Sequence, residues 1–507
     1  MTKAAVSAII YPMSTSTIVS RRSFLASTFA TAGAAVVGEA SSTKPVSPTA
    51  AAQGVGGAPN LVFGVVSDVH VRSKGEEATL AKALEFFRDA GADGVVIAGD
   101  IADSGRVAQL ELVANAWNAV FPGSKAPDGR PVERLFVYGN HDVLAWSWGG
   151  AKSRYTEEEL RAQAIGYKDN RACVWERIFG EKYEPIWAKT VKGYVFTGAH
   201  WGCEKGLDQV RQENAERLGL RGTKPVFHIQ HPHPSSTVQG LWAWGRDGGA
   251  ATRALEKFPN SVAFSGHSHY SITDERSIWQ GAFTSVGTGS LKYIFSQYWR
   301  ENGEGNDHGS KPSQMPILPE GKGRQGMVVR VYDDRMTFER REFVFGERLG
   351  PDWVVPLDGS RPYAFAPRRE KAVAPEFAQG ATVTVERLMG KNRQGKEVDQ
   401  VVVSFPAAKP SETSRVHDYE VAALAYHEDV DYPVSVKRVH SESFFLPPTR
   451  EAESGRIVFA ADELENCVVP VKGVKSVRFA VRPVECFGRK GHEILSEPFV
   501  LSPRADA

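Results

Sequence analysis

The pattern of apolar positions in the first folded region predicts strands that alternate with helices. Short continuous apolar runs occur at 61–66, 94–98 and 135–138, as expected of strands buried on both faces. Between them, apolar residues recur every three or four positions at 76–90 and 107–120, which predicts two helices. Strands that alternate with helices indicate an α/β layer architecture.

The same region continues with more strands. Further apolar runs predict strands at 194–197, 225–229 and 262–264. Residues 326–345 alternate on both sides of a polar turn, which is typical of a hairpin. We therefore assign residues 59–348 to one α/β domain and residues 349–374, rich in Pro and Arg, to a connector. Within the connector, Trp353-Val354-Val355 is apolar enough to pack back on the first domain.

The last part of the chain, residues 375–505, has a different pattern of apolar and polar residues. Short alternating or apolar runs are separated by turn residues, and no helical pattern is evident. These runs lie at 382–385, 401–405, 419–425 and 476–481. They predict an all-β sandwich. The segment 477–488 resembles the last hairpin of a fibronectin type III-like domain, and we expect a domain of that type here.

The N-terminus has the pattern of an export signal. Arg21-Arg22 is followed by Phe24-Leu25 and an Ala/Gly/Thr-rich apolar stretch, and small residues follow at Gly38 and Ala40. We predict a twin-arginine-type signal peptide at 1–40 and therefore a periplasmic or secreted protein. Residues 41–58 are rich in Ser, Pro, Ala and Gly, and predict a flexible linker. No other long apolar segment is evident, so we expect no transmembrane segment in the mature protein.

Composition narrows the classes of partner. The 507 residues include 61 basic and 60 acidic side chains, which give a net charge of +1. This balance provides no overall positive charge that would attract long nucleic acid. An anionic substrate must therefore be held by a local site. The four cysteines show no metal-binding CxxC spacing. Either Cys173 pairs with Cys203 and Cys467 with Cys486, or all four thiols are free.

Polar side chains follow the predicted strands at the points where these strands end. Asp68 and His70 come after the first strand, Asp100 after the second, and Asn140 after the third. Two histidine clusters follow later strands, and the candidate ligands in them are His231, His267 and His269. Ligands bind at the carboxyl ends of strands in open α/β sheets, so we expect these side chains to share one crevice.

This donor set suits two divalent metal ions about 3.5–4 Å apart. A carboxylate must bridge two cations that lie so close, and together they lower the pKa of water enough to form hydroxide near neutral pH. Gly99, Gly139 and Gly266 would let the backbone approach the metals without a Cβ. Imidazole and carboxylate donors suit two transition metal ions drawn from Mn, Fe, Zn or Co.

Some positions leave alternatives open. His228, His231 and His233 lie within six residues, and strand alternation favours His231 as the ligand. Asp142 either orients His141 or caps a helix. Each motif alone has a structural explanation, such as a turn or a surface histidine. No such explanation accounts for all five motifs occurring in this order, each directly after a predicted strand.

The motifs DxH, GDxxD, GNHD, a His-Pro cluster and GHSH make the chain resemble the calcineurin-like metallophosphoesterase family over residues 60–345. The resemblance implies a double β-sandwich flanked by helices. It also implies that Asp68, His70 and His269 bind the first metal and that Asp100 bridges. The ligands implied for the second metal are Asn140, His231 and His267. His141 resembles the family histidine that binds no metal and stabilises phosphoryl oxygens or protonates the leaving oxygen.

The resemblance predicts an exported binuclear metal-dependent phosphoesterase. A metal-bridging hydroxide is expected to attack phosphomonoesters or phosphodiesters, with a small phosphate ester as substrate. A purple acid phosphatase would carry a ligating tyrosine where this chain has Asp103, and no histidine at position 70. The alternative from another class is a non-catalytic, metal-containing binding protein of the cell envelope. Candidate substrate contacts are Arg72, Trp146 and Trp148, which lie close to ligand motifs.

Overall fold

The structure is a computed structural model. It describes residues 57–240, 243–294, 323–392, 395–427, 430–450, 452–468 and 476–501. The predicted signal peptide at 1–40, and all but the last two residues of the predicted linker at 41–58, lie outside the described residues.

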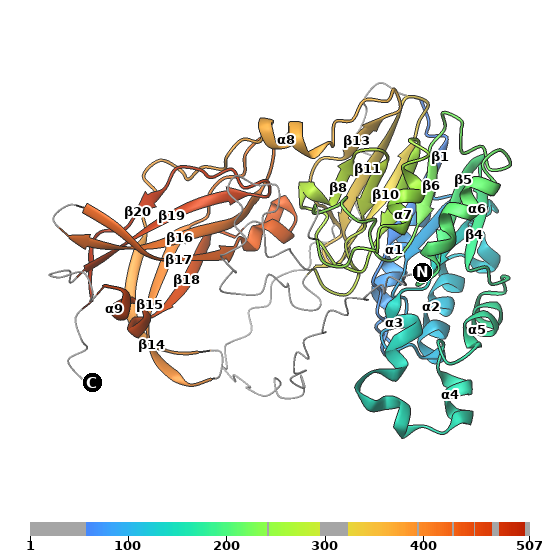
Figure 1. Cartoon of the computed structure of the whole chain (residues 1–507), viewed down its shortest axis with the longest axis horizontal. Helices are drawn as coiled ribbons and strands as arrows, with labels where there is room; N and C mark the ends of the chain where they lie inside the picture. The colour runs from blue at the N-terminus through green and yellow to red at the C-terminus, as the bar shows by residue number, and fades with distance from the viewer. Residues whose placement is uncertain are drawn as a thin grey trace, which may run out of the picture. The chain divides into compact units, whose positions relative to one another are not determined.

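The first β-sheet carries three parallel strands beside an antiparallel half (Figure 1). Its strand order is β12-β11-β10-β1-β2-β3, and β13 also pairs with β11. The parallel strands are β1 (Leu61–Val66), β2 (Gly94–Ala98) and β3 (Glu133–Val137). The antiparallel strands are β10 (Gln325–Val331), β11 (Arg335–Glu342), β12 (Glu347–Arg348) and β13 (Trp353–Pro356). The predicted hairpin and the packing back of Trp353-Val354-Val355 are thereby confirmed.

The second sheet has the order β4-β5-β6-β7-β9-β8 and is parallel from β5 to β9. Its strands are β4 (Ile186–Val191), β5 (Tyr194–Ala199), β6 (Val226–Ile229), β7 (Ser261–Ser265), β8 (Ile278–Gln280) and β9 (Thr284–Gly287). The strands predicted at 194–197, 225–229 and 262–264 therefore belong to a separate sheet.

A hydrophobic core joins the inner faces of the two sheets. In β1, Phe63 and Val65 face this core, while Val62 and Val66 face the helices on the outer side. The ring of Phe63 packs edge-on against the rings of Phe196, Phe227 and Phe264 from the second sheet, at centroid distances of 5.2, 4.9 and 5.7 Å. Because both faces of β1 are covered, its sequence is a continuous apolar run. The architecture is a double β-sandwich.

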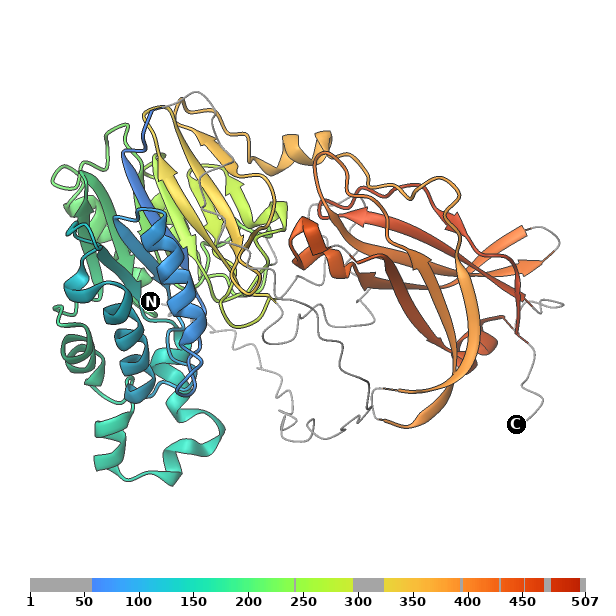
Figure 2. The same ribbon diagram turned by 180° about the vertical axis from the view of Figure 1, so that it is seen from behind.

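Helices cover the outer faces of the sandwich (Figure 2). Buried residues of α1 (Ala78–Asp89), α2 (Val107–Val120) and α5 (Asn170–Phe179) pack on the first sheet. Residues of α6 (Leu207–Glu213) and α7 (Ala250–Leu255) join a cluster on the second. Other helices are α3 (Asn140–Leu144), α4 (Glu157–Gln163) and α8 (Phe365–Lys371). The two helices expected between the first strands are thus present.

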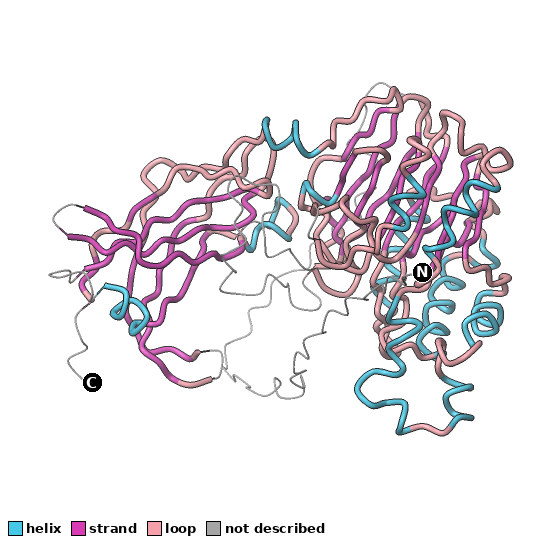
Figure 3. Tube along the Cα trace, viewed as in Figure 1, coloured by secondary structure: helices cyan, strands magenta, loops and turns pink. Residues whose placement is uncertain are grey.

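Strands predominate in the C-terminal region, where they form two antiparallel sheets (Figure 3). One contains β14 (Thr384–Lys391), β15 (Glu397–Pro406) and β18 (Ser454–Ala460). The other contains β16 (Val416–His427), β17 (Val430–His440), β19 (Ser476–Glu485), β20 (Ile494–Leu495) and β21 (Phe499–Val500).

One core, which includes Val401, Val421 and Val477, joins these two sheets into the expected β-sandwich. The short helix α9 (Ala461–Val468) corrects the expectation that this region contains no helix. Leu464 of α9 packs into the same core, so tertiary contact stabilises a helix of only two turns. The fibronectin type III-like identity of the sandwich stays a prediction.

Two smaller expectations concern cysteines and membranes. Cys173, Cys203 and Cys486 carry free thiols, and the side chain of Cys467 lies outside the described residues. Among the helices that the structure describes, none combines the length and apolar character needed to cross a membrane.

Candidate metal centre

Five loops bring the predicted ligands together, and each loop follows a strand. Asp68 and His70 follow β1, Asp100 follows β2, and Asn140 begins α3 directly after β3. From the second sheet, His231 follows β6, while His267 and His269 follow β7. These five strands lie in the parallel parts of the two sheets, so the carboxyl ends of both sheets meet at one site.

The backbone of this site is strained. The predicted ligands with a positive φ of 47–68° are Asp68, His70, Asp100, His267 and His269. Side chains other than glycine seldom adopt this left-handed region, and such residues cluster at functional sites. This conformation occurs in the loops that follow β1, β2 and β7.

One group of ligands surrounds the carboxylate of Asp68. The Nε2 atom of His269 lies 3.1 Å from Asp68 Oδ1, and the Nε2 atoms of His70 and His269 lie 3.2 Å apart. Two ligands that are each about 2.1 Å from one ion lie about 3 Å from each other. Asp68, His70 and His269 therefore have the spacing of donors to one metal ion.

A second group surrounds Asp100 and contains His231 and His267. Oδ2 of Asp100 lies 3.1 Å from His231 Nε2 and 3.5 Å from His70 Nε2, so the same oxygen faces both groups. Asn140 is buried, and its Oδ1 accepts no hydrogen bond from any described residue. A buried amide oxygen that accepts no hydrogen bond is available as a metal ligand.

Hydrogen bonds donated by Nδ1 orient three of the imidazoles. Nδ1 of His70 lies 3.1 Å from Asp103 Oδ1, that of His231 lies 2.7 Å from the Ala98 carbonyl, and that of His269 lies 3.0 Å from the Tyr293 carbonyl. Because each partner is an acceptor, each Nδ1 carries a proton and each Nε2 faces the site, where it can bind a metal ion once it has lost its own proton. Nε2 atoms that face one another or a carboxylate oxygen at ligand spacing fit two divalent metals.

The charges at the site are strongly coupled. Burial opposes the negative charge of Asp68 and Asp100, but the nearby imidazoles of His269 and His231 outweigh it and hold both pKa values well below the usual range. Burial likewise opposes a charge on His70, yet its bonds to Asp103 and Asp68 raise its pKa to about 10. The charge of Asp100, opposed again by burial, raises the pKa of His231 to about 9.

The two other histidines of the His-Pro cluster lie apart from the ligand groups. His228 is buried within β6, where its Nδ1 lies 3.0 Å from Thr197 Oγ1 and its Nε2 lies 3.1 Å from Gln230 Oε1. Burial lowers the pKa of both His228 and His233 to about 3. The geometry brings His231 alone of the three to Asp100.

His141 stands at the edge of the site. Its ring lies 4.4 Å from that of His70, and its Nδ1 lies 2.7 Å from the Asp103 carbonyl oxygen. Its backbone N–H donates to Asp100 Oδ1 at 2.8 Å. Burial lowers the pKa of His141 below its usual value.

Asp142 caps the N-terminus of α3, which is one of the two roles that the sequence allows. Its carboxylate accepts hydrogen bonds from the backbone N–H groups of Gly139, Ile101 and Ala102, at 2.7, 3.2 and 2.7 Å. It therefore ties the loop after β3 to the loop after β2. Burial and the charge of Asp100 raise the pKa of Asp142 to about 7, while these three bonds act in the opposite direction.

The predicted glycines serve the ligands themselves. A Cβ added at Gly99 would lie 2.3 Å from His231 Nδ1, and one at Gly139 would lie 2.1 Å from Asp100 Oδ1. At Gly266 an added Cβ would lie 2.4 Å from Asp68 Oδ2. These positions exclude larger residues because the side chains of the ligands fill the space.

The candidate substrate contacts have different surroundings. The indole of Trp146 donates to the Val143 carbonyl and packs on Tyr167, within a small hydrophobic cluster. The indole of Trp148 is exposed and lies 4.7 Å from the ring of His141. Arg72 forms an ion pair with Glu76 on the exposed side of the loop that carries His70.

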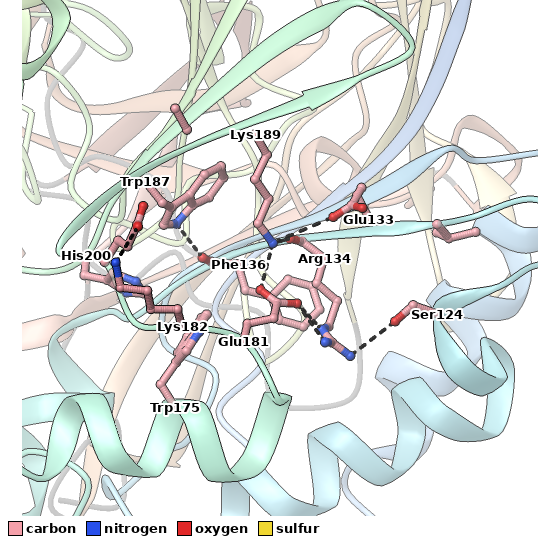
Figure 4. A pocket seen from close by; sticks show the side chains of 13 residues that line it. Ser124, Glu133, Arg134, Phe136, Trp175, Glu181, Lys182, Trp187, Lys189 and His200 are labelled. Carbon is pink, nitrogen blue, oxygen red and sulfur yellow. Dashed lines mark hydrogen bonds and ion pairs between the residues drawn. The ribbon is translucent and has the colours of Figure 1, made fainter. Parts of the chain in front are cut away.

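A cavity of about 420 Å³ lies apart from the ligand groups (Figure 4). It is lined by residues of the two edge strands β3 and β4. Side chains of β4 bond to free carbonyls of β3: Trp187 donates to Phe136 at 3.1 Å, and Lys189 donates to Arg134 at 2.7 Å. These bonds protect the open edge of the sandwich.

Fold and site together define a metallophosphoesterase domain. Residues 61–271 match the family model of the calcineurin-like phosphoesterases, so the chain contains a domain of this family, whose members use divalent metals. A comparison with curated proteins finds no match.

Solved structures give weaker similarities. A dimetal phosphatase from Danio rerio is 13% identical, with 59% of this chain and 100% of that chain covered and a TM-score of 0.32. GAP50, the anchor in the inner membrane complex of Plasmodium, is 14% identical, with 58% of this chain and 88% of that chain covered and a TM-score of 0.33. A predicted phosphoesterase from Streptococcus pneumoniae is 12% identical, with 58% of this chain and 97% of that chain covered and a TM-score of 0.23. TM-scores this low carry no argument about function.

Replacing Asp142 by Asn should weaken metal binding about 10–100-fold, as expected for a residue that orients ligands. The amide nitrogen cannot accept a hydrogen bond, so at least one buried N–H of the two loops loses its partner. Metal content after dialysis against a defined free-metal buffer measures the effect. The exposed Asp128→Asn is the control, and equal metal content in both variants would contradict the assigned role.

The stabilising effect of metal should increase with pH. In the metal-free protein, His70 and His231 have pKa values of about 10 and 9, above the unfolded value of about 6.5. The stability from their protonation is complete below pH 6.5 and is lost as pH rises towards 9–10. Metal binding displaces these protons and tightens over the same range. Melting temperatures with Mn²⁺ and with a chelator should therefore differ more at pH 8.5 than at pH 6, and an equal difference would contradict the coupling.

Proposed function

We propose that this protein is a binuclear phosphoesterase that hydrolyses phosphomonoesters or phosphodiesters. The observation that carries the proposal is the Asp100 oxygen that faces both ligand groups, at 3.1 Å from His231 and 3.5 Å from His70. A single shared carboxylate oxygen is the arrangement that a two-metal hydrolytic site requires. Two ions bound to these residues would supply Lewis acidity and would lower the pKa of water.

The side chains around the ligands would handle the proton and the substrate. His141 is fixed through Nδ1 by the Asp103 carbonyl, so its Nε2 can hold a proton and deliver it to the departing oxygen. Burial raises the pKa of Asp103 and the hydrogen bond with His70 lowers it, and the nearby charge of Arg72 adds a smaller lowering. From this place Arg72 would contact an outer phosphoryl oxygen. Of the two predicted tryptophans, only Trp148 faces His141, so our proposal for substrate contact keeps Trp148.

The rival function, a non-catalytic binding protein, has less support. Such a protein needs neither a complete set of ligands nor a strained backbone at five of them. It also needs no residue in the position of His141, which touches His70 but is held by a backbone carbonyl.

The assay uses metal-reconstituted protein with p-nitrophenyl phosphate and bis-p-nitrophenyl phosphate. Asp100→Ala should abolish hydrolysis and reduce the metal content, because the shared oxygen is lost. His141→Ala should keep both metals and lose about 10²–10⁴-fold in kcat, as expected when a general acid is removed. Absence of hydrolysis with both metals bound would sink the proposal, and loss of metal from His141→Ala would place His141 among the ligands.

Export through a twin-arginine route is part of the proposal and is supported by Arg21-Arg22 and the apolar stretch that follows. Replacing both arginines by lysine should retain the full-length precursor in the cytoplasm, because the receptor reads the arginine pair. Mass spectrometry of periplasmic and cytoplasmic fractions measures the outcome. Equal periplasmic recovery of the variant and the natural protein would contradict this route.

A further inference from the structure

Each of the two ligand groups has an exposed tryptophan against it. Trp148 is 46% exposed, and its indole packs edge-on at 4.7 Å against His141, which touches the first group at His70. Trp244 is 58% exposed, and its indole stacks on His267 of the second group at 4.9 Å and 22°. The two indoles therefore flank the ligand cluster from two different loops.

The backbone around Trp244 is anchored although its side chain is exposed. The N–H of Trp244 donates to the Tyr270 hydroxyl at 2.9 Å, and the preceding Ala243 is fully buried. Gly245 follows with φ +85°, and a Cβ there would lie 3.1 Å from the His267 ring. Gly245 thus permits the close approach that places the indole on His267.

Trp148 is separated from the packing of its own loop. Trp146, two residues earlier, occupies the cluster with Tyr167, Leu160 and Ala164. Trp148 has an extended backbone, with φ −73° and ψ 155°, and Gly149 and Gly150 follow at positive φ. The chain therefore turns away after presenting this indole beside His141.

Exposed indoles have an evident chemical use at this place. A single exposed apolar side chain needs no explanation, but here two large aromatic faces stay in solvent beside the rings that surround the reaction site. Aromatic faces recognise flat rings by stacking, and they discriminate them from aliphatic groups of similar size.

We infer that Trp148 and Trp244 bind the organic group of the substrate, and that the substrate is a phosphate ester of a planar aromatic group, either a simple aryl group or a nucleoside. This inference rests on the proposed phosphoesterase function. The indoles lie beside different ligand groups, so an ester arm that extends from the cluster on either side meets one of them.

The test is equilibrium binding, which needs no turnover. Phenylphosphonate and cyclohexylphosphonate have rings of the same number of carbons and differ in planarity, and their C–P bond replaces the ester oxygen. By calorimetry, metal-loaded protein should bind phenylphosphonate about tenfold more tightly, as one stacking contact provides. Trp148→Leu and Trp244→Leu should reduce this preference, and the double variant should abolish it.

Trp279→Leu is the matched control, because its partly buried indole packs on Phe283 in the outer cluster of the second sheet. It should keep the full preference. Metal content is measured for every variant, so a loss of ligand geometry is separated from a loss of stacking. Equal affinity of the natural protein for the two phosphonates, or an unchanged preference in the double variant, would overturn the inference.

Two further arms separate the possible outcomes. In the first, phenylphosphonate binding is measured in the presence of saturating adenosine. Weaker binding assigns the planar group of the substrate to a nucleobase, whereas unchanged binding assigns it to a simple aryl group. A preference for phenylphosphonate without hydrolysis of either nitrophenyl ester overturns the phosphoesterase function and leaves the aromatic site standing. Hydrolysis without that preference overturns the aromatic site alone.

Discussion

The burial of two carboxylates is the constraint on which the rest of the catalytic domain depends. Asp68 and Asp100 are 0% and 1% exposed, and an isolated buried carboxylate costs several kcal/mol. Positive charge must therefore be supplied at the centre of the site. Protonated His70 and His231 supply it in the metal-free protein, and two divalent ions would supply it in the loaded one. The demand for cations is thus a consequence of the fold itself.

This demand explains why the surrounding structure is so strongly tied together. The two sheets meet where the His231 ring bonds to the Ala98 carbonyl and where the His267 N–H contacts Asp68. Asp142 joins the loops of β2 and β3, and carbonyl or carboxylate oxygens fix the imidazole tautomers. Strained residues at the ends of strands persist only where neighbouring contacts determine their conformation, and these bonds provide such contacts.

The local sequence pattern predicted those elements correctly whose buried faces are formed by a single strand or helix. The runs at 61–66 and 94–98 and the helix at 107–120 match β1, β2 and α2 in type and bounds, because continuous apolar runs and helical spacing encode covered faces directly. The short helix α9 was missed, since only its packing in the β-sandwich core makes two turns of helix stable. The sequence pattern also could not predict which strands belong to which of the two sheets, because strand pairing joins residues far apart in the chain.

At the site, the sequence by itself determined which chemistry is possible: carboxylate, amide and imidazole donors, each placed after a strand. The tertiary structure alone decided how they act. It selected His231 over His228 and His233, made Asp142 a link between loops, and placed Trp148 rather than Trp146 beside His141. It also brought Trp244 onto His267. The physical reason is that donor type and strand ends are local properties, whereas distances across the site join residues as far apart in the chain as Asp68 and His269.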